Sequence, residues 1–424
     1  MTCKSAISRD ESVRASVVLL LLAGLLACAS TISPLAALST TLLILTVLNY
    51  WFTRDVLYPG FLFCLVWLAA TVGYLLFPGL IAPLGWRAAI IFASGATLMS
   101  LGCILGNRPL FKRSVTEVSP QLTPNPLSGR LLLIYVAIIC PFFFLDTVRL
   151  AGGFEWSPMF FIRARDAIVA VHRASDAPAY SNRILSTAPM TSILTVWILM
   201  LGHHSRRAIY CSVAIASFMC ILTTGRTGTL QLLCGCAVIV ALKRQDRSVA
   251  AMRTKLVLIA TGVLLLFTAT TLLTKRETQG DDMLAAASTM TMSYIAGPLA
   301  AFDFGIHHFE ESEHLDAFVG VPFYTNVYTA YRTYYLLVRD LCSIPFLLFG
   351  AVHGILYHAA VRGRRIASFL MAYLYYALVL SPFADAYGLA IRHLQVLGIA
   401  VICFWLMPKF NFSVVAPRCS MSPC

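Results

Sequence analysis

Long apolar runs, separated by short polar segments, recur along the whole of this chain. A continuous run of about 20 apolar residues is long enough for a helix to cross a bilayer. The pattern therefore predicts about twelve transmembrane helices with both chain ends on one side of the membrane. Their expected ranges are 15–30, 35–52, 56–77, 88–106, 131–150, 184–202, two between 207 and 243 that divide at 224–228, 256–274, 335–360, 366–383 and 393–407.

Composition supports a membrane protein. Hydrophobic residues make up 59% of the 424 residues and charged residues 12%, whereas soluble domains carry about 25% charged residues. We expect an all-α polytopic membrane protein in which residues 1–424 form a single membrane-embedded domain. The 13 cysteines are scattered and imply no disulfide framework.

The basic residues predict the orientation. They gather in Lys243–Lys255 and Val361–Arg365, and clusters of Lys and Arg mark cytoplasmic loops. Both termini are then cytoplasmic, and two large loops, 151–183 and 275–334, lie outside the cell membrane. The same rule accounts for the formal net charge of +13, so no nucleic-acid partner is expected.

The larger outside loop, 275–334, is polar, aromatic and rich in Gly, His and acidic residues. Connections between packed elements are usually short, so a segment of this length predicts a functional role. Asp303, His307 and His308 are its candidate general bases, with Glu277 and Asp282 as further candidates. A carboxylate or imidazole can accept the proton of an attacking hydroxyl. The alternative is that the histidines are solvated loop residues.

Metal-binding and nucleotide-binding patterns are missing from the sequence. It contains no HExxH string, no P-loop and no DxD string. We therefore expect neither a metal ion nor another cofactor.

Arginines stand on the expected outer side, where the topology rule predicts few. Their planar, permanently charged fork suits phosphate groups, which indicates a lipid-linked phosphate or pyrophosphate. Arg226 lies in a Gly-flanked turn between two predicted helices, where a charge is costly without a partner. The alternative is pairing with loop acids or lipid headgroups. The candidate pyrophosphate-binding residues are Arg226, Arg276, Arg163, Arg165 and Arg332.

A tyrosine-rich string follows at 320–335. Tyr324, Tyr328, Tyr331 and Tyr335 are spaced three or four apart, which on a helix would form one aromatic face. Such a face could stack on sugars, and Tyr324, Asn326, Tyr328 and Tyr331 are the candidate sugar-binding residues. An aromatic belt at the membrane interface would produce the same pattern.

Four strings resemble the O-antigen polymerase family of bacterial inner-membrane proteins, which join oligosaccharide repeat units. They are TTGRTGTLQLL at Thr223–Leu233, SYIAGPLAAFD at Ser293–Asp303, GVPFYTNVYTAYRTYY at Gly320–Tyr335 and FGAVHGILYH at Phe349–His358. The family layout of about a dozen helices and two large periplasmic loops is also similar. The motifs are short and degenerate, and Asp340-Leu341-Cys342 stands where such proteins often have an acidic-aromatic-Gly turn.

The resemblance implies a membrane glycosyltransferase in the bacterial inner membrane, which builds O-antigen, capsule or exopolysaccharide at the periplasmic face by inverting glycosyl transfer. The donor would be a growing glycan on undecaprenyl pyrophosphate, and the acceptor a single lipid-linked repeat unit. Membrane lipids and a chain-length regulator protein are the implied partners. No metal is implied, and Arg226 and Arg276 would hold the pyrophosphate leaving group.

Two other functions stay open. An O-antigen ligase performs the same chemistry with a lipid A-core acceptor, and the sequence barely separates it from a polymerase. Twelve helices also suit a lipid-linked oligosaccharide flippase or transporter. Against that function, the halves of the chain show no repeat, and the polar residues gather in the predicted outside loops.

Overall fold

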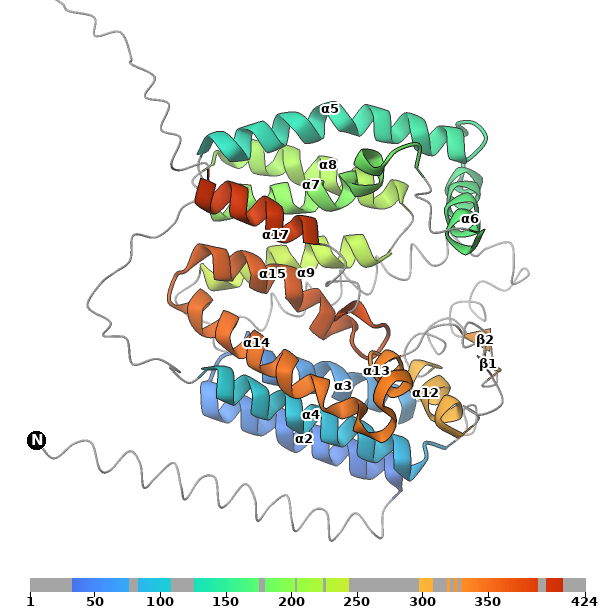
Figure 1. Ribbon diagram of the computed structural model, residues 1–424, viewed down its shortest axis with the longest axis vertical. Helices are drawn as coiled ribbons and strands as arrows, with labels where there is room; N and C mark the ends of the chain where they lie inside the picture. The colour runs from blue at the N-terminus through green and yellow to red at the C-terminus, as the bar shows by residue number, and fades with distance from the viewer. Residues whose placement is uncertain are drawn as a thin grey trace, which may run out of the picture.

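A computed structural model shows an almost wholly helical protein (Figure 1). It describes residues 33–75, 83–107, 126–174, 180–202, 204–223, 226–243, 297–307, 319–320, 324–325, 329–387 and 394–406. The predicted helices 15–30 and 256–274 lie outside these residues. Within them, most helices run side by side across the view.

The described helices follow the predicted apolar runs closely, with the exception of the run 335–360. Their bounds are α2 Pro34–Thr53, α3 Pro59–Leu75, α4 Trp86–Asn107, α5 Pro126–Leu150, α7 Arg183–Leu201, α8 Arg206–Leu222, α9 Arg226–Leu242, α14 Pro345–Val361, α15 Arg365–Leu380 and α17 Leu394–Val401, which continues as a π-helical turn, η3 Ile402–Leu406. Their starts carry local signals: Ser33, Asn182 and Ser205 each cap a helix by accepting a backbone N–H.

Among the described residues, four helices are long and apolar enough to cross a membrane. They are Pro34–Thr53, Trp86–Asn107, Leu127–Leu150 and Arg183–Leu201, and a bent pair could supply a fifth. Large apolar side chains such as Val47, Ile138 and Leu145 are more than half exposed on these helices. Exposed apolar surface on this scale is typical of contact with a partner or a membrane, so the chain is compatible with a membrane-embedded protein.

The helices pack in three groups, stacked from bottom to top in Figure 1. The first contains α2, α3, α4 and α14, and the third contains α5, α7 and α8. Between them lie α15 and α9, which contact each other and join α14 to α7. One continuous core of buried side chains runs through the first and middle groups and into α7 and α8.

The closest helix contact joins α4 to α14. A Cβ atom added at Gly350 would lie 3.0 Å from both the Cys103 nitrogen and the Gly102 Cα, and one added at Gly102 would lie 2.8 Å from the Ala351 nitrogen. Gly106 and Gly354 repeat the contact one turn further along. Small residues four apart let two backbones touch, a packing mode common in membranes. The glycines of the string Phe349–His358 therefore have a structural role.

The expected single helix 335–360 is wrong, because the segment breaks into three pieces. An α-helix, α13 Tyr331–Val338, leads into a 3₁₀ turn, η2 Arg339–Ser343, and α14 then leaves at an angle of 87°. Arg339 has a φ of 53°, in the left-handed region, and Pro345 stands at the first turn of α14. Proline suits a helix start and not its interior. The break places η2 against α4.

The two predicted outside loops contain regular structure. The segment 151–183 includes α6 Pro158–Ala174, which packs against α5. The segment 275–334 includes α12 Gly297–His307 and an antiparallel pair, β1 Val319–Gly320 and β2 Tyr324–Thr325. All of these elements, with α13, lie at the right-hand end of the bundle in Figure 1. We call this the α12 end.

Candidate functional site

Asp303 and His307 lie one turn apart on α12. His307 Nε2 is 3.8 Å from Asp303 Oδ1, and Asp303 Oδ2 accepts a hydrogen bond of 2.9 Å from the backbone N–H of Gly85. The Asp303 side chain is only 14% exposed, whereas that of His307 is 54% exposed. A nearly buried carboxylate therefore stands behind an imidazole that solvent can reach.

Burial raises the pKa of Asp303, and the Gly85 hydrogen bond and the nearby His307 oppose that rise. Asp303 Oδ1 is buried and has no hydrogen-bond partner among the described residues, and His307 Nε2 lies 3.8 Å from it. An ionised carboxylate in this position stabilises the protonated imidazole. The pair can thus accept a proton at His307 from a hydroxyl at the protein surface.

Gly85 holds α12 against the start of α4. A Cβ atom at this position would lie 2.9 Å from Asp303 Oδ1 and 3.4 Å from His307 Nε2. A side chain here would therefore displace the Asp303 carboxylate, whereas 3.4 Å is an ordinary contact with His307. Tyr74, at the end of α3, also interacts electrostatically with Asp303. Neither Gly85 nor Tyr74 was predicted from the sequence, because both lie more than 200 residues away along the chain.

A second polar group lies beside this pair. Arg87 donates from Nε and Nη2 to the two carboxylate oxygens of Asp340, at 2.9 and 3.0 Å. The guanidinium groups of Arg87 and Arg339 each lie 5.9 Å from the ring centre of Tyr335. Such contacts between cations and aromatic faces are favourable. Asp340 thus has an ion-pair partner that the sequence did not indicate.

Phe302 joins the two groups. Its ring packs edge-on against Tyr335 at 5.8 Å, and its chain neighbour is Asp303. We call the combined set the α12–α13 cluster, which consists of Asp303, His307, Arg87, Tyr335 and Asp340. It brings together acidic, basic and aromatic side chains from α4, α12, α13 and η2 at the α12 end of the bundle (Figure 1).

The predicted pyrophosphate-binding arginines are spread over several elements. Arg163 and Arg165 lie on α6, where Arg163 pairs with Glu155 at 2.7 Å. Arg332 lies on α13, one turn before Tyr335, and is partly buried. Arg226 begins α9. Arg276 lies outside the described residues. Arg332 therefore shares α13 with Tyr335 of the α12–α13 cluster. Arg163 and Arg165 lie on α6, which contributes no residue to that cluster.

Tyr331 belongs to the protein core. Its side chain is 0% exposed, stacks on Phe346 at 4.2 Å and meets Trp67 edge-on at 5.2 Å. A sugar cannot reach this ring, so the sugar-binding role predicted for Tyr331 does not fit the structure. The reason is that α13 turns this residue toward α4 and α14, whose rings enclose it.

The tyrosine string does not form a single helical face. Tyr324 lies in β2, and α13 begins only at Tyr331. Thr329 and Ala330, which directly precede α13, are not helical. Asn326, Tyr328 and the candidate base His308 lie outside the described residues.

Within the part of the chain that the structure describes, no three His, Cys, Asp or Glu side chains gather as a metal site would require. The chemistry that the described residues support is proton transfer at the α12–α13 cluster, with cationic and aromatic groups beside it. The sequence matches no protein-family model, no curated protein and no solved structure.

Proposed function

We propose that this protein is a glycosyltransferase of the bacterial inner membrane. It polymerises repeat units linked to undecaprenyl pyrophosphate at the periplasmic face, and about twelve helices place both termini in the cytoplasm. The observation that carries the proposal is the Asp303–His307 pair, whose exposed imidazole is backed by a largely buried carboxylate. The four strings that resemble O-antigen polymerases support the choice of substrate.

In the proposed reaction, His307 accepts the proton from a sugar hydroxyl of the acceptor, and Asp303 stabilises the resulting imidazolium. The hydroxyl oxygen forms a bond to the anomeric carbon of the donor glycan. The bond from that carbon to the pyrophosphate oxygen breaks, and undecaprenyl pyrophosphate leaves with the electron pair. Fixed cations stabilise this developing charge, a role we assign to Arg226 and Arg276.

The test is in vitro polymerisation by purified protein supplied with defined lipid-linked repeat units. His307→Gln and Asp303→Asn should slow chain growth by about 100-fold or more, the usual range for loss of a general base. Glu155→Gln is the matched control, because Glu155 is an exposed, ion-paired acid at the same end of the bundle. Full-length products from both His307→Gln and Asp303→Asn would refute the assignment.

Orientation can be tested separately. Reporter fusions at Gln279 and Ser175 should give an external signal, and fusions at Asp246 and Gly363 an internal one. The reason is that basic clusters flank the last two positions. An internal signal at Gln279 would place the α12–α13 cluster on the wrong side of the membrane for this substrate.

An O-antigen ligase would use the same pair with a different acceptor. A deletion strain distinguishes the two functions. A polymerase deletion should leave single repeat units attached to the cell surface, whereas a ligase deletion should remove all attached glycan.

A buried polar pair favours a transporter or flippase as the second candidate function. His353 of α14 is 1% exposed, and its Nε2 lies 3.3 Å from the Tyr387 hydroxyl. Its Nδ1 is buried with no hydrogen-bond partner among the described residues. Ionisable residues inside a helix bundle often mark transport pathways. Vesicles in which purified protein moves lipid-linked glycan without lengthening it, and in which His353→Phe stops that movement, would favour this function.

A further inference from the structure

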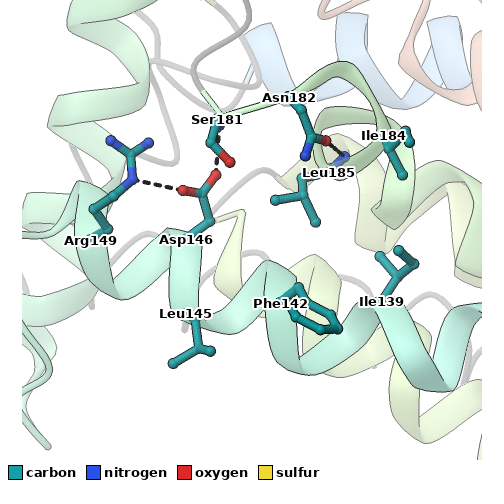
Figure 2. Close-up of a pocket in the computed structure, with 9 residues that line it drawn as sticks. All are labelled: Ile139, Phe142, Leu145, Asp146, Arg149, Ser181, Asn182, Ile184 and Leu185. Carbon is teal, nitrogen blue, oxygen red and sulfur yellow. Dashed lines mark hydrogen bonds and ion pairs between the residues drawn. The ribbon is translucent and has the colours of Figure 1, made fainter.

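A cavity of about 420 Å³ opens between the end of α5 and the start of α7 (Figure 2). It is separate from the α12–α13 cluster and from the predicted arginine sites. One wall is polar and contains Asp146, Arg149 and Ser181. The other is apolar and includes Phe142, Leu145 and Ile184. We call this cavity the α5–α7 groove.

A buried carboxylate organises the polar wall. Asp146 Oδ1 accepts a hydrogen bond of 2.7 Å from Arg149 Nε, and Oδ2 accepts one of 2.7 Å from the backbone N–H of Ser181. The Asp146 side chain is 7% exposed, whereas that of Arg149 is 60% exposed. Asp146 therefore fixes one edge of the guanidinium. The two terminal nitrogens of Arg149 have no hydrogen-bond partner among the residues that the structure describes.

The first turn of α7 adds a second positive feature. Asn182 caps this helix by accepting a 2.8 Å hydrogen bond from the Leu185 N–H, and the first regular backbone bond runs from Ser186 to Asn182. The N–H groups of Arg183 and Ile184 precede that bond and have no partner within the helix. A helix of 19 residues also carries a partial positive charge at this end. Helix starts of this kind bind phosphate groups.

The apolar wall continues along a candidate membrane span. Phe142 and Leu145 lie on Leu127–Leu150, and their side chains are 56% and 60% exposed. Arg149 stands one turn beyond Leu145, at the end of the same helix. A cation at the end of an exposed apolar stripe lies at the depth of lipid headgroups. The groove thus has a site for an anion at the end of the helix and an apolar surface next to it. A phospholipid has its phosphate and its acyl chains in the same arrangement.

We infer that the α5–α7 groove binds a bilayer phospholipid. Its phosphodiester accepts hydrogen bonds from the terminal nitrogens of Arg149 and the first turn of α7, and an acyl chain lies along Phe142 and Leu145. The charge balance selects this occupant over a lipid-linked pyrophosphate. Asp146 already offsets the charge of Arg149, so the remaining attraction suits one negative charge better than two or more.

The experiment measures lipid binding to the purified full-length protein by native mass spectrometry, with phosphatidylglycerol as the probe. Arg149→Gln should weaken binding by about tenfold or more, the loss expected for one hydrogen bond between charged groups. Arg130→Gln is the matched control, because Arg130 is also an exposed arginine of α5, near the opposite end of that helix. Diacylglycerol, which has the chains without the phosphate, should bind weakly and without dependence on Arg149.

Leu145→Gln is a second variant that keeps the test independent of folding, because Leu145 is mostly exposed and Asp146 keeps its partner. It should also weaken phosphatidylglycerol binding. Wild-type binding by both Arg149→Gln and Leu145→Gln would overturn the inference. So would undecaprenyl pyrophosphate displacing phosphatidylglycerol at far lower concentration, which would identify the groove as a substrate site instead.

Discussion

Replacing Gly350 by alanine should force α4 and α14 apart. The added methyl group would lie 3.0 Å from the Cys103 nitrogen and 3.0 Å from the Gly102 Cα, and closer still to the Met99 carbonyl oxygen. Ordinary contacts of a methyl carbon measure 3.4–4 Å. All three neighbours are backbone atoms, which cannot rotate away as a side chain can. One helix must therefore shift.

The magnitude follows from two opposing effects. Overpacking of a tight core costs about 1–3 kcal/mol, and contacts with rigid backbone belong at the upper end of that range. Alanine recovers about 1 kcal/mol because it is a better helix former than glycine. A net loss of about 2 kcal/mol remains, which corresponds to a fall of several degrees in melting temperature.

Thermal unfolding of the purified protein in detergent measures this loss. Gly398→Ala is the matched control, because Gly398 also lies in a helix and nothing stands within 4 Å of an added Cβ. It should melt at or slightly above the wild-type temperature. If Gly350→Ala melts as high as Gly398→Ala, the backbones of α4 and α14 are not in contact and the reasoning fails.

Three further predictions concern the α12–α13 cluster. Burial raises the pKa of Asp303 in the folded protein, so this carboxyl lowers stability as the pH rises above its unfolded value of about 3.9. Asp303→Asn should therefore flatten the decline in melting temperature between acid and neutral pH, measured against wild type. An unchanged pH profile would contradict the burial of this carboxyl. Gly85→Ala should reduce activity at normal membrane levels, because its methyl would displace the Asp303 carboxylate that stands behind His307; wild-type glycan length would refute that contact. Asp340→Asn should lower the free energy of unfolding by no more than about 1 kcal/mol, because its ion pair with Arg87 is exposed. A much larger loss in thermal unfolding would show that the pair is buried.

Much of this protein's helical architecture could be predicted from the sequence. Apolar runs predicted α2, α4, α7 and α15 to within a few residues. Local chemistry explains this success, because a serine or asparagine cap and a run of about 20 apolar residues act through near neighbours alone. Residue type and position in a long polar segment also suggested Asp303 and His307 as candidate bases, a role that stays a prediction.

Other features depended on contacts between distant segments. Gly85 and Arg87 reach Asp303 and Asp340 across 218 and 253 residues, and no pattern in the sequence connects those positions. The break between α13 and α14 depends on a left-handed residue, Arg339, which is not a glycine and gives no warning in the sequence.

Tyr331 shows most clearly why the sequence alone could not identify the buried side chains. The sequence placed it on an aromatic face, but the structure buries it between α4 and α14. In a soluble helix the polar face identifies the outside, so the buried side can be predicted. In a membrane helix the lipid-facing surface is as apolar as the core. Hydrophobicity alone thus indicates which segments are helices, and only the packing of those helices decides which side chains lie inside.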